Sequence, residues 1–102
     1  MALKAPPPYV AGHQLLAGKS VLITAAAGAG IGFAAATRAA EEGCRSLMIS
    51  DIHEGRLAKA VAALQAETGL EAVFGRLANV TDEADVQALV DEAEQRLGGV
   101  DV

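Results

Sequence analysis

Short apolar runs alternate along this chain with longer segments of mixed polarity. Three runs rich in apolar and β-branched residues occupy positions 20–24, 46–51 and 71–77. Runs of this length and composition predict buried strands of a parallel sheet. A fourth run, at positions 100–102, predicts the beginning of one more strand.

The segments between these runs predict helices. Residues 31–42 are rich in alanine and are followed by Gly43, a residue type that often ends helices. Residues 53–68 and 82–97 carry apolar positions at spacings of three and four, which is typical of a helix with one buried face. Thr81 is the expected N-cap of the last helix.

The order β-α-β-α-β-α-β predicts an α/β fold. Strands that alternate with helices of this length form parallel sheets with right-handed crossovers. We therefore expect the beginning of a Rossmann-like, doubly wound parallel sheet with strand order 3-2-1-4, incomplete at its fourth strand. Residues 19–102 would form this domain, and residues 1–18, with three consecutive prolines, a separate N-terminal arm. Val10, Leu15 and Leu16 are candidates for holding the arm on the domain.

Composition narrows the possible functions. The 102 residues carry a net charge of -5, which argues against nucleic-acid binding. The sequence shows no apolar stretch long enough to cross a membrane and no signal peptide. A single cysteine, Cys44, fits a reducing compartment, so we expect a cytoplasmic protein. No group of Cys and His residues has metal-binding spacing.

A loop of small residues joins the first strand to the first helix. Residues 25–32 read Ala-Ala-Ala-Gly-Ala-Gly-Ile-Gly. Glycines at such a turn let the backbone approach a pyrophosphate, and the start of the following helix offers unpaired N–H groups to it. We call residues 24–32 the glycine loop. It predicts a dinucleotide site, because a strand precedes it and a helix follows it.

Asp51 ends the second strand, 19 residues after Gly32. A carboxylate at this position is expected to accept hydrogen bonds from the ribose hydroxyls of NAD and to repel the 2′-phosphate of NADP. The glycine loop also contains no Arg or Lys, so NAD is favoured, although His53 and Arg56 could partly offset the repulsion. A second interpretation is structural, with Asp51 and Glu54 forming a capping box.

These landmarks together resemble the short-chain dehydrogenase/reductase family, whose fingerprint is Thr-Gly-x-x-x-Gly-Ile-Gly followed later by Asp-Val-Thr-Asp. Thr24, residues 30–32 and residues 79–82 carry the resemblance, which covers about residues 19–102. Within the family the chain is most similar to 3-oxoacyl reductases. The resemblance and the loop predict these cofactor-binding residues: Thr24, Ala26, Gly28, Ala29, Gly30, Ile31, Gly32, Asp51, Asn79 and Val80.

Two positions depart from the family pattern. The segment from Thr24 to Gly30 is one residue too long, so the first glycine of the fingerprint falls on Ala25 or Ala26, and Gly28 is a candidate to replace it. Asn79 stands where the family has Asp against the adenine. We expect its side-chain oxygen to accept a hydrogen bond from the exocyclic amine of that base.

The resemblance implies an oxidoreductase that moves a hydride between nicotinamide and a small-molecule alcohol or carbonyl. Family members use a Ser, a Tyr and a Lys and commonly form homo-oligomers. Tyr9 is the only tyrosine here and no Lys follows at the family spacing, so no catalytic residue is predicted. We expect the N-terminal, cofactor-binding part of such an enzyme, without turnover or a sharp thermal transition by itself. The alternatives are a non-catalytic nucleotide-binding module, an inactive truncated remnant, and a Rossmann-like methyltransferase, which the motif order disfavours.

Overall fold

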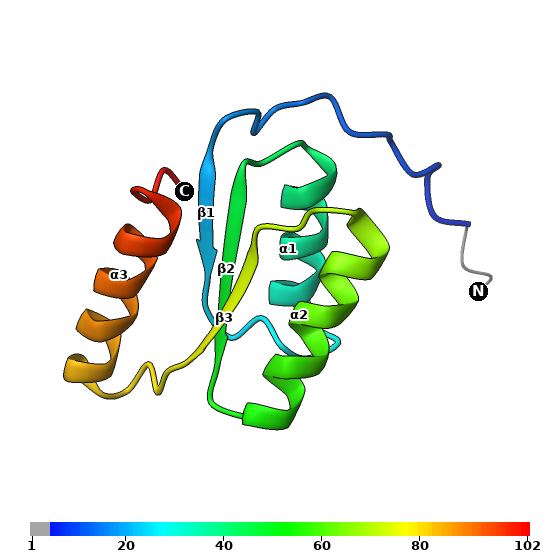
Figure 1. Cartoon of the computed structure of the whole chain (residues 1–102). Helices are drawn as coiled ribbons and strands as arrows, with labels where there is room; N and C mark the ends of the chain where they lie inside the picture. Colours follow the sequence, from blue (N-terminus) through cyan, green and yellow to red (C-terminus); the bar gives the residue numbers. More distant parts are fainter. Residues whose placement is uncertain (1–4) are drawn as a thin grey trace.

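Strands and helices alternate along the chain as the sequence predicts (Figure 1). The computed structural model describes residues 5–102. Its elements are β1 (Ser20–Ile23), α1 (Ile31–Glu41), β2 (Ser46–Asp51), α2 (Glu54–Thr68), β3 (Val73–Leu77) and α3 (Glu83–Leu97). Two strands are shorter than predicted, because Thr24 lies beyond the end of β1 and Glu71 precedes β3.

β2 lies in the middle of a parallel sheet with the order β1-β2-β3. Leu22, Met48 and Phe74 lie side by side in its register. The parallel sheet and the predicted order 3-2-1 are confirmed. The carboxyl ends of all three strands meet at one edge, where open α/β sheets bind ligands.

Helices cover both faces of the sheet (Figure 1). α1 and α2 pack on one face, and α3 packs on the other. β2 shows the alternation that this arrangement requires: Leu47 and Ile49 face α1 and α2, whereas Met48 faces α3. The small buried side chains of Ala36 and Ala39 give α1 a flat face toward the sheet.

The predicted fourth strand is present only as hydrogen bonds along the outer edge of β1. Residues 100–102 form no strand, but Leu22 N donates to the carbonyl oxygen of Val102 at 2.9 Å. Val102 N donates to the Ser20 carbonyl at 3.1 Å, and Ser20 N donates to Asp101 Oδ2 at 2.8 Å. This tail therefore occupies the place predicted for strand 4.

Both predicted N-caps are wrong by one or two residues. The Nδ1 atom of His53 accepts from Arg56 N and caps α2, because Asp51 still belongs to β2. Asp82 accepts from the first N–H groups of α3, and Thr81 lies one residue too early. The glycines predicted to end the three helices are confirmed, since Gly43, Gly69 and Gly98 all have positive φ.

The arm is held by polar contacts, and the predicted apolar attachment is wrong for two of three side chains. Val10 and Leu15 are 58% and 71% exposed, and only Leu16 packs on the core. Instead the carboxylate of Glu42, which is 3% exposed, accepts from His13 N at 2.7 Å and from Leu15 N at 3.2 Å. The sequence does not mark Glu42 as different from its neighbour Glu41.

Glu42 makes the attachment of the arm sensitive to acid. Hydrogen bonding from the backbone of His13 lowers the pKa of Glu42 below its usual 4.5, although burial opposes the shift. Leu15 N–H and Arg38 add to the lowering. Because the folded-state pKa is lowered, this contribution is present above pH 4.5 and is lost as the pH falls through the lowered value.

We expect Glu42→Gln to release the arm at neutral pH. The amide cannot pair with Arg38 as a carboxylate does, and it offers one oxygen in place of two. Amide hydrogen exchange at His13 and Leu15 should become several-fold faster. Glu41→Gln is the matched control for charge, because the Glu41 carboxylate contacts the arm at the exposed Tyr9 hydroxyl and not at His13 or Leu15. Equal exchange in both variants would show that Glu42 does not anchor the arm.

Candidate dinucleotide-binding site

The glycine loop lies at the carboxyl edge of the sheet and is tied to the end of β2. Ala26 N donates to the Ser50 carbonyl at 3.0 Å, and Ala27 N donates to Asp51 Oδ2 at 3.2 Å. α1 begins after Gly30, where no side chain caps the helix and no acidic residue stands in the first turn. The first N–H groups of α1 are therefore available to an anion.

The three glycines of the loop differ in the space that surrounds them. A Cβ on Gly32 would lie 2.6 Å from the Ala25 carbonyl oxygen and 2.9 Å from Ala26 Cα, so the close approach of α1 to the loop requires glycine there. A Cβ on Gly30 would meet nothing within 4 Å, and one on Gly28 would meet only Gly30 N at 4.0 Å. Gly28 and Gly30 thus leave space open beside the start of α1.

Ala25 adopts the backbone conformation that favours glycine. Its φ is +54°, in the left-handed region, whereas Gly28 is outside that region. Of the candidate positions for the first fingerprint glycine, only Ala25 therefore has the left-handed conformation, and Gly28 does not. Ala26, a predicted contact residue, is fully buried, and its N–H already donates to the Ser50 carbonyl. The ambiguous alignment at residues 25–26 was the one sequence signal for this position.

The Asp51 carboxylate accepts hydrogen bonds from backbone N–H groups and has a lowered pKa. Its Oδ1 accepts from His53 N at 3.0 Å, and its Oδ2 accepts from Ala27 N. Burial by itself would raise the pKa of this carboxyl, but hydrogen bonds from the backbone N–H groups of His53, Ala27 and Ile52, and the charge of Arg56, outweigh burial and lower it. Asp51 is therefore ionised at neutral pH.

Asp51 also lines a pocket of about 330 Å³ at the ends of β2 and β3, which we call the Asn79 pocket. Its lining residues are Ala25, Asp51, Ile52, Ala78, Asn79, Val80 and Thr81. Ile52 and Val80, which are 71% and 55% exposed, give the wall of this pocket an accessible apolar surface. The pocket brings three predicted site residues, Asp51, Asn79 and Val80, together with Ala25.

Asn79 does not present its side-chain oxygen as predicted. Its Oδ1 accepts from Thr81 N at 3.0 Å and from Thr81 Oγ1 at 2.6 Å. Its own N–H donates to Asp85 Oδ2 at 2.9 Å. Both lone pairs of the amide oxygen are therefore used within the turn that leads to α3.

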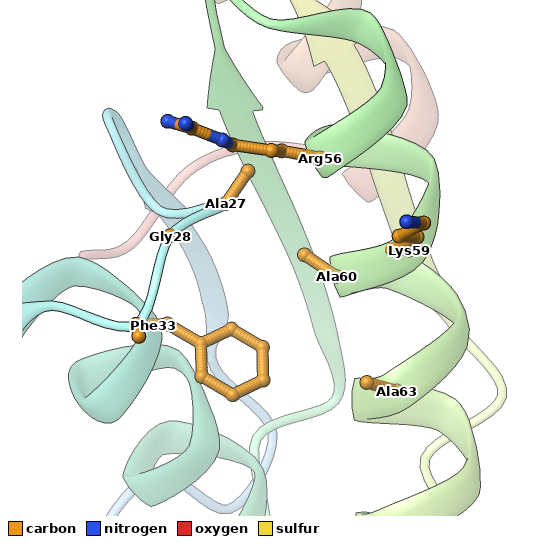
Figure 2. A pocket seen from close by; sticks show the side chains of 8 residues that line it. Ala27, Gly28, Phe33, Arg56, Lys59, Ala60 and Ala63 are labelled. Atoms are coloured by element: carbon orange, nitrogen blue, oxygen red, sulfur yellow. The ribbon is translucent and has the colours of Figure 1, made fainter.

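A second pocket of about 420 Å³ lies on the other side of the glycine loop, between α1 and α2 (Figure 2). The side chain of Arg56 extends past Ala27, while Phe33, Ala60 and Ala63 supply apolar surface. The predicted residues Gly28 and Ala29 line this pocket and not the Asn79 pocket. The predicted cofactor-binding residues therefore lie on two sides of the loop. Ile31, which is 91% exposed, lies at the start of α1.

Two other features bear on the kind of site. Within residues 5–102, no three His, Cys, Asp or Glu side chains are grouped so that they could hold a metal ion. Over the same part of the chain, every helix is too short or too polar to span a bilayer.

Comparison with known proteins identifies the family. Residues 19–102 match the family model described as short chain dehydrogenase. The chain belongs to the short chain dehydrogenase family. The (5R,7aS)-5-hydroxy-7a-methyl-1-oxo-2,3,5,6,7,7a-hexahydro-1H-indene-carboxyl-CoA reductase of Mycobacterium tuberculosis is 48% identical over 102 residues, which are 100% of this chain and 38% of that protein.

Solved short chain dehydrogenases share the fold. The structure of one from Mycobacterium smegmatis is 42% identical, with a TM-score of 0.88 over 95% of this chain and 40% of that one. One from Burkholderia phymatum, in complex with NAD, is 40% identical with a TM-score of 0.76 over 83% of this chain and 29% of that one. The chain spans only 30% to 38% of the length of the curated relatives that it matches.

Proposed function

We propose that the carboxyl edge of the sheet binds a nicotinamide dinucleotide and that the chain is the cofactor-binding part of an alcohol/carbonyl oxidoreductase. The observation that carries this proposal is the ionised carboxylate of Asp51, which lies between an uncapped helix start and an apolar-walled pocket. The carboxylate suits a ribose, the uncapped helix start suits a pyrophosphate, and the pocket suits a flat base.

The site residues would act on different parts of the cofactor. The N–H groups at the start of α1, with the space beside Gly28 and Gly30, would hold the pyrophosphate. Asp51 would accept from the ribose hydroxyls, and the base would lie between Ile52 and Val80. Thr24, Ala26, Ala29, Ile31 and Gly32 remain assigned to the same site. When bound, the cofactor would supply or accept the hydride.

We assign NAD in preference to NADP. The negative charge of Asp51 opposes a 2′-phosphate, and the family member from Burkholderia phymatum was solved with NAD. The preference is not a family rule, since an L-sorbose reductase from Gluconobacter frateurii was solved with NADPH. Arg56, beside the loop, would reduce the discrimination without reversing it.

For the whole protein we propose a 3-oxoacyl or 3-hydroxyacyl-type substrate, a homo-oligomeric state and a cytoplasmic location. The name of the Mycobacterium tuberculosis relative, a carboxyl-CoA reductase, supports an acyl thioester. The cytoplasmic assignment rests on Cys44, a buried free cysteine. Burial raises the pKa of its thiol, which argues against a reactive role.

Titration of the whole protein with NADH and NADPH, followed by nicotinamide fluorescence, tests the proposal. We expect NADH to bind at least about tenfold more tightly, because a like-charge contact of a 2′-phosphate with Asp51 costs more than 1.4 kcal/mol. Absence of binding by both dinucleotides would overturn the proposed function. Tighter binding of NADPH would overturn the assignment of NAD alone.

A further inference from the structure

Two cationic side chains without an ion-pair partner among residues 5–102, Arg56 and Lys59, line the pocket between α1 and α2. The cations Arg38, Arg76 and Arg96 each pair with a glutamate. Arg56 and Lys59, by contrast, are both exposed beside a pocket of about 420 Å³. On a chain with a net charge of -5, this local positive charge favours an anion at the pocket.

The rest of the pocket wall is apolar. Phe33 packs partly on the core, and its ring faces Ala60 and Ala63 across the pocket (Figure 2). Figure 2 shows Arg56 and Lys59 toward one end of the pocket and Phe33 and Ala63 toward the other. A concave site of this volume, with an apolar wall and a few charged groups at one place, is typical of a small-molecule site.

The glycine loop separates this pocket from the Asn79 pocket. The two pockets share no lining residue, and the N–H of Ala27, on one side, donates to the carboxylate of Asp51, on the other. Asp51 interacts with Arg56 at longer range than an ion pair and is already engaged by the N–H groups of His53 and Ala27. A single negative charge therefore faces the two positive charges of Arg56 and Lys59.

We infer that the pocket between α1 and α2 binds a small amphiphilic anion, a carboxylate with an apolar body. The carboxylate would contact Arg56 and Lys59, since hydrogen bonds between charged groups are the strong ones. The apolar body would lie against Phe33, Ala60 and Ala63 and would be removed from water there. This ligand and a dinucleotide can be bound at once, so the site does not depend on the proposed function.

The test uses anilinonaphthalene sulfonate, an apolar anion that fluoresces in apolar surroundings, as the probe of the whole protein. We expect Arg56→Gln and Lys59→Gln each to weaken binding of the dye by about fivefold or more. Lys19→Gln is the matched control, because Lys19 precedes β1 at the opposite edge of the sheet and is in no ion pair within residues 5–102. Its affinity for the dye should equal that of the native protein.

Competition with simpler molecules tests the two halves of the ligand. Octanoate, which has both a charge and an apolar chain, should displace the dye. Octanol, which lacks the charge, and inorganic phosphate, which lacks the chain, should each displace it at least about fivefold less well. If either one competes as well as octanoate, the pocket does not select an amphiphilic anion, and the inference is overturned.

Saturating NAD+ should leave binding of the dye unchanged. Displacement of the dye by NAD+, or by NADP+ alone, would assign the pocket to the dinucleotide and overturn the inference, while the proposed function would stand. Equal weakening in all three variants would show an effect of net charge only, and unchanged affinity in Arg56→Gln and Lys59→Gln would show that the dye binds elsewhere. Either result would also overturn the inference. If the dye binds as expected and neither dinucleotide binds, the proposed function fails and the inference stands.

Discussion

Alanine at position 32 is expected to destabilise the fold by about 1–3 kcal/mol and to remove dinucleotide binding. The new Cβ would lie 2.6 Å from the Ala25 carbonyl oxygen and 2.9 Å from Ala26 Cα, and both are backbone atoms that cannot rotate away. α1 would have to move off the loop. Its first N–H groups would then leave the position in which they can meet a pyrophosphate.

The matched control is Gly30→Ala. Its Cβ would meet nothing within 4 Å, so the free energy of unfolding should change by less than about 1 kcal/mol. Binding should nevertheless weaken, because the methyl group would stand in the space proposed for the ligand. Denaturant unfolding and NADH titration of both variants of the whole protein give the comparison. Unfolding curves of Gly32→Ala that overlay the native ones would refute the tight packing of α1 on the loop.

Asparagine at position 51 is expected to weaken NADH binding by about tenfold or more. A carboxylate offers an acceptor to each ribose hydroxyl and to the N–H groups of His53 and Ala27, whereas the NH2 of an amide would face one of these N–H groups, which is also a donor. Removal of the negative charge should also improve NADPH binding. The ratio of the two dissociation constants should therefore change by a larger factor than the affinity for NADH does. Parallel titrations with both dinucleotides measure the shift.

Glu54→Gln provides the control for net charge. It removes one negative charge three residues along the chain, from a side chain that lines a different pocket. Its preference for NADH should stay at the native value. Because the pKa of Asp51 is lowered, Asp51 itself should stay ionised from pH 7 down to its ordinary value of 3.8. The 2′-phosphate of NADPH gains a proton near about pH 6, so the preference is compared at pH 7 or above. An equal shift in both variants would assign the discrimination to overall charge and not to Asp51.

The elements of the fold were predictable because their signals are local. A continuous apolar run such as residues 46–51 permits few structures other than a buried strand, and Gly69 and Gly98 end helices through their own φ. The N-caps were placed wrongly for the same reason. Several residues near each helix start could cap it, and the length of the preceding strand or turn decides among them.

The features that sequence reasoning missed depend on contacts between distant segments. Glu42 differs from Glu41 only because the arm, 27 to 29 residues earlier, folds over it. The side-chain oxygen of Asn79 was expected to accept a hydrogen bond from a base, but it accepts from Thr81, two residues along the chain, instead. Residue identity indicated where the candidate site lies. Hydrogen bonding within the folded chain determined which atoms remain free to bind.

The tail on the outer edge of β1 has a consequence for the order of folding. Ser20 and Asp101 are separated by 81 residues, so their contact closes a loop of most of the chain. β2, α2 and β3 are consecutive and can pair without such a closure. We therefore expect that unit to form early and the outer edge of β1 to be paired late. The glycine loop, which follows β1, would be among the last segments to reach its final position.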